Sequence, residues 1–218
     1  MNLLFFSIFL GKQAFAYDYE VNGVYYYINA SSLTATVTYG DNPYEGAVFI
    51  PDSIIYKGKS LPVKYVGEFA FKDCTNLTSI QLGHRILEIS SSAFEGCSNL
   101  TSMTIPSSVG GIGERAFYGC TNLTKLTIED RNSTLRCSPS SVFDCKLKYL
   151  YIGRDIGYPE YGIIYNLDNT NLSTIIIGSG KTFISGFNGS KISTISIPAN
   201  VTEIRKGCFR IFKNLSEI

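Results

Sequence analysis

Three cysteines recur at a fixed spacing, and a cysteine thiolate can bind zinc or form a disulfide. Cys74, Cys97 and Cys120 follow one another at intervals of 23 residues, within "AFKDCTNL", "AFEGCSNL" and "AFYGCTNL". A zinc site usually gathers four ligands in closely spaced pairs, whereas these residues lie far apart and the chain holds a single histidine. The pattern therefore predicts a column of buried thiols that behave as small hydrophobic side chains, with no metal site.

A disulfide is predicted at a different pair of cysteines. Side chains on adjacent parallel strands point the same way, so a bridge between two of the recurring cysteines would be strained. Cys137 and Cys145 lie eight residues apart across an irregular insertion. They are the better candidates for a bridge in an oxidising compartment.

No cofactor site is predicted either. The stretch "IIIGSGKTF" resembles a phosphate-binding loop, but the glycine that this loop needs five residues before Gly180 is Ile175. In the repeat alignment Gly178 matches Pro106, which predicts a turn between strands rather than a nucleotide site.

Catalytic residues are equally absent from the pattern. His84 falls in a turn and is expected to be solvated, and no Ser-His-Asp or Cys-His pair forms without it. Asp and Glu lie mainly in loops at no recurrent position, so no carboxylate pair for glycoside hydrolysis is assigned. The chain is therefore not expected to be an enzyme.

A repeated strand must position these side chains. Six segments, such as "LTSIQL" and "LTSMTI", carry apolar residues at their first, fourth and sixth positions, and alternation with period two is typical of a half-buried strand. These six segments and a shorter seventh, "LSEI", begin 20 to 25 residues apart, at Leu77, Leu100, Leu123, Leu147, Leu172, Ile192 and Leu215. Repeats of this length predict a solenoid of stacked parallel strands, about 4.8 Å apart.

The segments between the strands repeat as well. "IGERAFYGC" (residues 112–120) predicts a turn or two of helix with Ala116, Phe117 and Cys120 facing inward. One position of the core is expected to be filled in each unit by an aromatic ring, namely by Phe71, Phe94, Phe117 and Phe209. An asparagine recurs just before the strand, at Asn76, Asn99, Asn122, Asn171 and Asn214. Its side-chain amide is expected to form hydrogen bonds with backbone groups that the bend leaves unpaired.

The combined pattern "IGERAFYGCTNLTKLTI", with "IPSSV" before the next unit, resembles the BspA-type leucine-rich repeat over residues 63–218. The match is strong in the first three units and looser from Phe143 to Ile152 and in the two units that follow. It is clear again in the last unit, where Cys208 takes the alanine position and Phe212 the cysteine position. The resemblance implies an α/β solenoid, a right-handed superhelix with one parallel strand per repeat. It also implies a secreted or cell-surface protein that adheres to an extracellular protein or glycan, such as host matrix.

The N-terminal region differs from the repeats. Residues 1–16 contain the apolar run "LLFFSIFL" and end in Ala14-Phe15-Ala16, which predicts a secretory signal cut before Tyr17; the alternative is a buried N-terminal strand. Residues 17–62 contain Asn22-Gly23 between two alternating apolar runs, a strong hairpin signal, and two further strand-like runs, "LTATVTYG" and "GAVFIP". They are expected to form an antiparallel β-rich N-terminal cap.

Residues 63–218 would then hold about seven units, of which the last is truncated at Ile218. The function expected for this organisation is non-enzymatic binding. The alternative is a structural spacer, or an auxiliary module of a longer extracellular protein.

Composition excludes two classes of partner. The chain has 218 residues, a net charge of +1 and no basic stripe, so neither nucleic acid nor an anionic membrane is indicated. No segment after the N-terminal run is apolar enough to span a membrane.

The outward strand positions suggest where a ligand would bind. They are small and polar in the first three units, except for Lys125, but the fourth unit carries Lys148, Tyr149 and Tyr151. Exposed tyrosines on a Ser/Thr-rich sheet are typical of contact sites. We therefore predict a binding patch centred on Lys125, Lys148, Tyr149 and Tyr151. The alternative is that the insertions "EDRNSTLRCSPSS" and "RDIGYPEYG" fold over these tyrosines and cover them.

Overall fold

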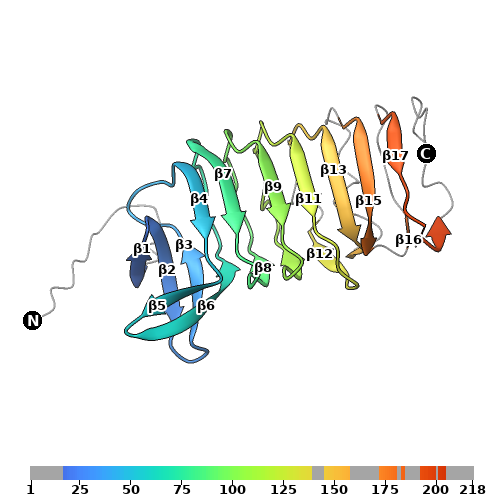
Figure 1. The fold of residues 1–218 in the computed structure, drawn as a ribbon. Coiled ribbons are helices and arrows are strands. Elements are labelled where there is room, and N and C mark those ends of the chain that lie inside the picture. Colours follow the sequence, from blue (N-terminus) through green and yellow to red (C-terminus); the bar gives the residue numbers. More distant parts are fainter. Residues whose placement is uncertain are drawn as a thin grey trace, which may run out of the picture.

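The computed structural model describes residues 17–138, 145–157, 172–180, 183–184, 192–199 and 201–204. These residues form a β-solenoid in which each repeat unit makes one rung (Figure 1). The solenoid that the repeats predict is thus present, as a stack of parallel strands. No helix occurs among the described residues, and therefore none long and apolar enough to span a membrane.

Two sheets run along the solenoid. The front sheet is parallel throughout and consists of β9 (Ser102–Ile105), β11 (Lys125–Ile128), β13 (Tyr149–Arg154), β15 (Thr174–Gly180) and β17 (Thr194–Ser196). The rear sheet contains the second short strand of each rung, namely β8 (Glu88–Ile89), β10 (Gly111–Ile112), β12 (Leu135–Cys137) and β14 (Ile156–Gly157). A separate parallel pair is formed by β16 (Phe183–Ile184) and β18 (Glu203–Ile204). The core lies between the front and rear sheets.

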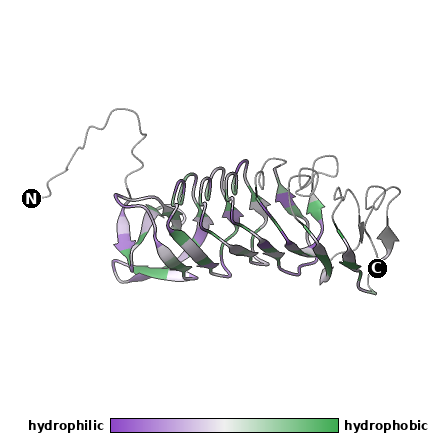
Figure 2. Cartoon of the chain, turned by 90° about the horizontal axis from the view of Figure 1, so that it is seen from above, coloured by the Kyte–Doolittle hydropathy of each residue, from purple (hydrophilic) through white to green (hydrophobic). Residues whose placement is uncertain are grey.

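The alternation of side chains in the front sheet follows the sequence pattern. Leu126 and Ile128 of β11 are fully buried and stand in register with Leu150 and Ile152 of β13, whereas Lys125 is exposed. The strands accordingly carry both hydrophobic and hydrophilic residues (Figure 2). Each buried Leu or Ile side chain stabilises the stack by about 1.5–3 kcal/mol.

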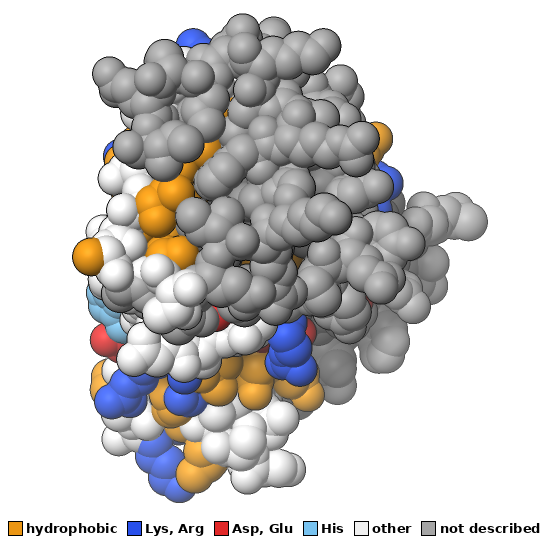
Figure 3. All heavy atoms as spheres, turned by 90° about the vertical axis from the view of Figure 1, so that its right-hand side faces the viewer, with side chains coloured by type: hydrophobic (Ala, Val, Ile, Leu, Met, Phe, Trp, Pro, Cys, Tyr) orange, Lys and Arg blue, Asp and Glu red, His pale blue; other side chains and the backbone are white. Residues whose placement is uncertain are grey.

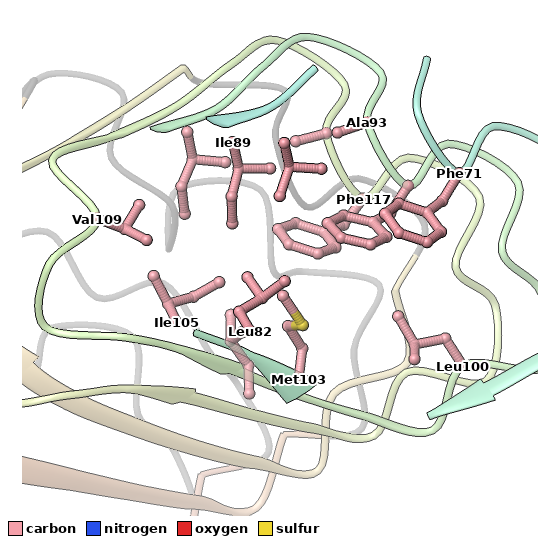
Figure 4. Packing of buried hydrophobic residues seen from close by; sticks show 14 of the residues in the cluster. Phe71, Leu82, Ile89, Ala93, Leu100, Met103, Ile105, Val109 and Phe117 are labelled. Carbon is pink, nitrogen blue, oxygen red and sulfur yellow. The ribbon is translucent and has the colours of Figure 1, made fainter. Parts of the chain in front are cut away.

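The recurring phenylalanines form a continuous ring stack, as predicted. The centroids of Phe71 and Phe94 lie 4.9 Å apart, and those of Phe94 and Phe117 lie 5.3 Å apart with nearly parallel planes. Figure 4 shows Phe71 and Phe117 in this stack, and Tyr44 packs against Phe71 at 4.4 Å. Phe209, predicted for the same position, lies outside the described residues.

The recurring cysteines are buried thiols, also as predicted, and each makes a hydrogen bond that the sequence did not reveal. In three rungs the thiol donates to the phenylalanine carbonyl of the preceding rung: Cys97 to Phe71, Cys120 to Phe94 and Cys145 to Phe117. The predicted disulfide between Cys137 and Cys145 was wrong, because both residues carry free thiols. Cys145 instead makes the same bond to a phenylalanine carbonyl as Cys97 and Cys120 do.

The predicted helix at residues 112–120 was wrong as well. This segment and its equivalents are turns, and two positions in each have left-handed backbone: first Phe69, Ser92 and Arg115, then Asp73, Gly96 and Gly119. A right-handed helix cannot contain such residues. Their backbone groups pair between rungs instead, as in the bond from Phe71 N to Ala93 O (2.7 Å) and that from Phe94 N to Ala116 O (2.8 Å).

The proposed role of the repeat asparagines also fails in the described part of the chain. Asn76, Asn99 and Asn122 are exposed, and their side chains make no hydrogen bond there. The turns are held by backbone bonds instead, such as Leu100 N to Cys97 O (3.2 Å) and Leu123 N to Cys120 O (3.0 Å). Asn171 and Asn214 lie outside the described residues.

The N-terminal strands are β1 (Tyr19–Val21), β2 (Val24–Asn29), β3 (Thr34–Thr38), β4 (Gly46–Ile50), β5 (Ser53–Tyr56) and β6 (Lys59–Val66). The predicted hairpin is confirmed: β1 pairs antiparallel with β2, and Asn22 and Gly23 both have positive φ, as a tight hairpin turn requires. Antiparallel pairing also joins β2 to β3 and β5 to β6.

These strands join the solenoid through parallel pairing. In the rear sheet, β3 pairs with β6 and β6 pairs with β8. In front, β4 pairs with β7 (Leu77–Leu82), and both continue the row of front-sheet strands (Figure 1). The N-terminal residues 1–16, predicted as a signal, and Phe143, Cys208, Phe212 and Leu215 of the later units lie outside the described residues.

Candidate functional site

Three of the four predicted contact residues lie on two neighbouring strands of the front sheet. Lys125 on β11 is the register partner of Tyr149 on β13, and Thr127 is the partner of Tyr151. The side chains of these two register pairs point away from the core, so together they form a small surface at the centre of the sheet. Lys148 is exposed just before β13, where its backbone N–H donates to Thr124 O at 2.8 Å.

Two rows of outward side chains cross the sheet at this point. The first row consists, strand by strand, of Ser102, Lys125, Tyr149, Thr174 and Thr194. The second row consists of Thr104, Thr127, Tyr151, Ile176 and Ser196. Tyr149 is therefore flanked by Lys125 and Thr174, and Tyr151 by Thr127 and Ile176.

Lys125 and Tyr149 make a direct contact. The ammonium nitrogen of Lys125 lies 5.2 Å from the centroid of the Tyr149 ring, within the range of a cation–π interaction. This contact holds a positive charge over the Tyr149 ring, near the start of both strands.

An open hollow of about 520 Å³ lies beside these residues. Its lining comes from three rungs and consists of Ser107, Lys125, Thr127, Glu129, Asp130, Tyr149 and Tyr151. Lys148, although close in sequence, is not among the lining residues. The hollow thus places one cation near the start of the strands and two carboxylates near their ends.

Asp130 is fixed at the edge of the hollow by two hydroxyl groups. Tyr151 Oη donates to Asp130 Oδ2 at 2.6 Å, and Ser179 Oγ donates to Asp130 Oδ1 at 3.2 Å. The hydrogen bond to Asp130, followed by burial, raises the pKa of Tyr151 to about 12. The phenol therefore stays protonated well above neutral pH, and the two hydroxyl groups hold the Asp130 carboxylate in one orientation at the edge of the hollow.

Gly178 lies directly behind this pair. A Cβ atom at Gly178 would overlap the Asp130 carboxylate, the Tyr151 hydroxyl and the Gly153 backbone. The sequence assigned Gly178 to a turn, which was wrong, because it lies inside β15. It permits the close approach of Tyr151 and Asp130, and neither residue spacing nor composition indicated this role.

The wall of the hollow at Ser107 is held by charged side chains from later rungs. Glu129 Oε2 accepts a hydrogen bond from Ser107 N (2.8 Å), and Arg131 donates to the carbonyls of Ser107 and Ser108. Arg154, fully buried, donates to the carbonyls of Pro106 (2.9 Å), Ser107 (3.0 Å) and Val109 (2.6 Å).

Burial lowers the pKa of the Arg154 guanidinium from its ordinary value, and the neighbouring charge of Arg131 acts in the same direction. The group is nevertheless bound to three carbonyls of one turn, which fixes the backbone beside the hollow. No residue pattern indicated a role for Arg154, because an arginine at a strand end is usually solvated.

The insertions proposed to cover the tyrosines are only partly described. Asp130, from the first insertion, reaches Tyr151, and both tyrosines are half-buried. Residues 139–144 and 158–171, which hold the rest of the two insertions, lie outside the described residues. His84 is exposed in a turn, as expected, and Lys181 of the loop resembling a phosphate site is not described.

A family model and solved structures of other proteins resemble this chain. The family model described as the BspA type leucine rich repeat region matches residues 53–169 and 165–218, with six copies. The solved Leucine Rich Repeat protein of T. pallidum shares 20% identity and a TM-score of 0.51, with 82% of this chain and 77% of that chain covered. This likeness supports the leucine-rich repeat fold. No curated protein matches the chain.

Two further solved structures are more distant in shape. A leucine rich cell surface protein of Faecalibacterium prausnitzii shares 24% identity, with a TM-score of 0.47 and 85% of this chain covered. This chain spans 50% of the length of that protein. The pneumococcal vaccine antigen PcpA shares 17% identity, with a TM-score of 0.38, 84% of this chain and 70% of that chain covered.

Proposed function

The chain belongs to the BspA type leucine rich repeat family, and from this premise we propose that it is a non-enzymatic binding protein, secreted or held at the cell surface. Its partner is an extracellular protein or glycan, such as a component of host matrix. Residues 1–16 serve as the secretory signal, residues 17–62 as the N-terminal cap and residues 63–218 as the repeat solenoid that presents the binding surface.

One observation carries this proposal: Tyr149 and Tyr151 stand beside Lys125 and around an open hollow, where the equivalent positions of β9 are Ser102 and Thr104. Tyrosine rings offer a rigid, flat contact area at a small cost in conformational entropy. Neighbouring charged groups then fix the orientation of a ligand by hydrogen bonds.

The charges around the hollow suggest how a ligand is oriented. Lys125 and Lys148 lie near the start of the strands, while Glu129 and Asp130 lie near the end of β11. A ligand with an anionic group would place it toward the lysines, and hydroxyl or amino donors would face the two carboxylates. Both peptides and glycans offer such groups, so the proposal covers both.

The test is a binding array of glycans and matrix proteins. The wild-type protein is expected to bind a subset of the array, and the Tyr149→Ser, Tyr151→Ser double variant is expected to lose about tenfold or more in affinity for that subset. The Ser102→Ala, Thr104→Ala variant alters the equivalent positions on β9 and serves as the matched control. It should bind as the wild type does.

Two results would contradict the proposal. If the double tyrosine variant binds as tightly as the wild type, the contact surface lies elsewhere. If the wild type binds nothing on a broad array, the spacer function becomes the better interpretation.

A further inference from the structure

The two sheets of the solenoid end differently at the N-terminal side. The rear sheet continues beyond β6 into β3, β2 and β1, which cover its edge. The front row instead stops at β4, which pairs with β7 alone within the described part of the chain. Proteins usually cover or blunt such an edge, because its unpaired backbone groups can bind another strand.

The open edge of β4 offers main-chain hydrogen-bonding groups at defined positions. Gly46 N donates to Asn76 O at 2.9 Å, so Gly46 turns toward β7. In a parallel pair, alternate residues bond to a given neighbour. The register shifts between Gly46 and Ala47, but the extra residue, Thr78, belongs to β7, so alternation along β4 itself continues. Ala47 and Phe49 therefore direct their N–H and C=O groups away from β7, toward the open side.

A partly enclosed hollow of about 520 Å³ lies along this edge. Its β4 side includes Val48 and Phe49, and Phe49 is 57% exposed although it is a large hydrophobic residue. Buried Tyr25, Tyr26 and Tyr44 also line the hollow. The lining also includes the hairpin turn at residues 21–24.

These walls decide which occupant fits. The hairpin turn lines the hollow together with β4, so an occupant seated along the β4 edge contacts both, as a single extended segment can. Glu45 is the single charged residue among those that line the hollow, and exposed Asp41 lies next to Asn42 of the lining. The site therefore favours a narrow, partly apolar chain with a positive charge.

We propose that the open edge of β4 binds an extended peptide segment of a protein partner by strand addition. The peptide bonds to the backbone of Ala47 and Phe49, places apolar side chains in the hollow at alternate positions, and sets a lysine or arginine beside Glu45. This site lies at the opposite end of the solenoid from the later rungs and does not depend on the surface around Tyr149 and Tyr151.

The test uses a random peptide library displayed on phage and selected on the full-length protein. Selected peptides are expected to share alternating apolar residues and at least one lysine or arginine. The Phe49→Pro variant removes the outward N–H while the ladder to β7 remains, since an edge strand tolerates proline there. It should weaken binding of the selected peptides by about tenfold or more.

The Phe49→Thr variant is the matched control, because it removes the ring but keeps the N–H, and it should bind more tightly than Phe49→Pro. Glu45→Gln should abolish the preference for basic peptides. If Phe49→Pro fails to fold, as judged by circular dichroism, the selected peptide is methylated on alternate amide nitrogens, which should abolish its binding to the wild type.

Three results would overturn the proposal. The first is that the selection enriches no peptide. The second is that Phe49→Pro and Phe49→Thr bind the selected peptides equally, or that the methylated peptide still binds the wild type. The third is that the wild type sediments as a dimer and Phe49→Pro as a monomer, which would identify a second copy as the occupant.

Discussion

The thiol of Cys97 donates a hydrogen bond to the carbonyl oxygen of Phe71, 3.0 Å away and one rung earlier. The same carbonyl accepts a second bond from Cys74 N at 3.1 Å. The bond therefore links two rungs at a buried point, beside the ring stack that runs through the core. It gives a polar reason for a cysteine to recur where a small hydrophobic residue would also fit.

The first prediction follows from this bond. Cys97→Ala should destabilise the protein by about 0.5–1.5 kcal/mol more than Cys137→Ala, since both remove a buried sulfur but only Cys97 loses a donor to a carbonyl. The free energy of unfolding in urea measures the difference. Equal losses for the two variants would mean that the thiol acts by packing alone.

The second prediction concerns the ring stack. Phe94 is fully buried between two other rings, so Phe94→Ala should destabilise by about 3–5 kcal/mol. Thr101 is exposed just before β9, and Thr101→Ala should change the free energy of unfolding by no more than about 0.5 kcal/mol. Similar values for both would contradict the inward and outward assignment of the two positions.

Strands and the ring stack could be predicted because their signal is local. The alternation of Leu126 and Ile128 with polar neighbours gives the strand and its buried face directly. The turn segments could not be predicted in this way, because Phe69, Ser92 and Arg115 adopt left-handed backbone without being glycines. Bonds between rungs hold that conformation, and they depend on a neighbour that local propensity does not include.

The residues of the contact surface also fall into a predictable and an unpredictable group. Tyr149 and Tyr151 could be predicted, because they depart from the Ser/Thr pattern of the outward strand positions. Asp130 and Ser107 stand in turns of two earlier rungs, and the stacking of those turns brings them to the hollow. Their position depends on the length of each rung, which varies between units.

The third prediction tests the role of Gly178. Gly178→Ala should destabilise by about 1–3 kcal/mol, because the new Cβ would displace Asp130 and Tyr151 or the backbone at Gly153. Gly110→Ala is the matched control: its Cβ would meet only Leu87 O at 3.7 Å, and a change within about 0.5 kcal/mol is expected. Thermal unfolding of the wild type and both variants measures the difference in stability. If Gly178→Ala is as stable as the wild type, Tyr151 and Asp130 do not approach residue 178 closely.

The fourth prediction addresses the N-terminal segment. Since the apolar run ends in Ala-x-Ala, the secreted protein should begin at Tyr17. Mass spectrometry of protein recovered from the medium of an expressing cell gives the first residue. A mature chain that retains Met1 would contradict both the signal and the proposed localisation.

The fifth prediction is a dependence of stability on pH that arises from Glu95. Its carboxylate lies 2.9 Å from an Arg115 guanidinium nitrogen and 3.3 Å from the Lys72 ammonium nitrogen. The hydrogen bond from Arg115 is the main cause that lowers the pKa of Glu95 from 4.5 to about 2. Because the folded pKa is depressed, the ion pairs stabilise the protein above pH 4.5, and this contribution is lost as the pH falls toward 2.

The matched variant for this measurement is Glu95→Gln, which keeps the shape of the side chain and removes its charge. Both basic partners are about two-fifths exposed, so screening limits the contribution to about 1 kcal/mol. The difference in unfolding free energy between wild type and variant should therefore be about 1 kcal/mol at pH 6 and shrink steadily between pH 4.5 and 2. A difference that stays constant over this range would show that Glu95 is not held as an ion by Arg115 and Lys72.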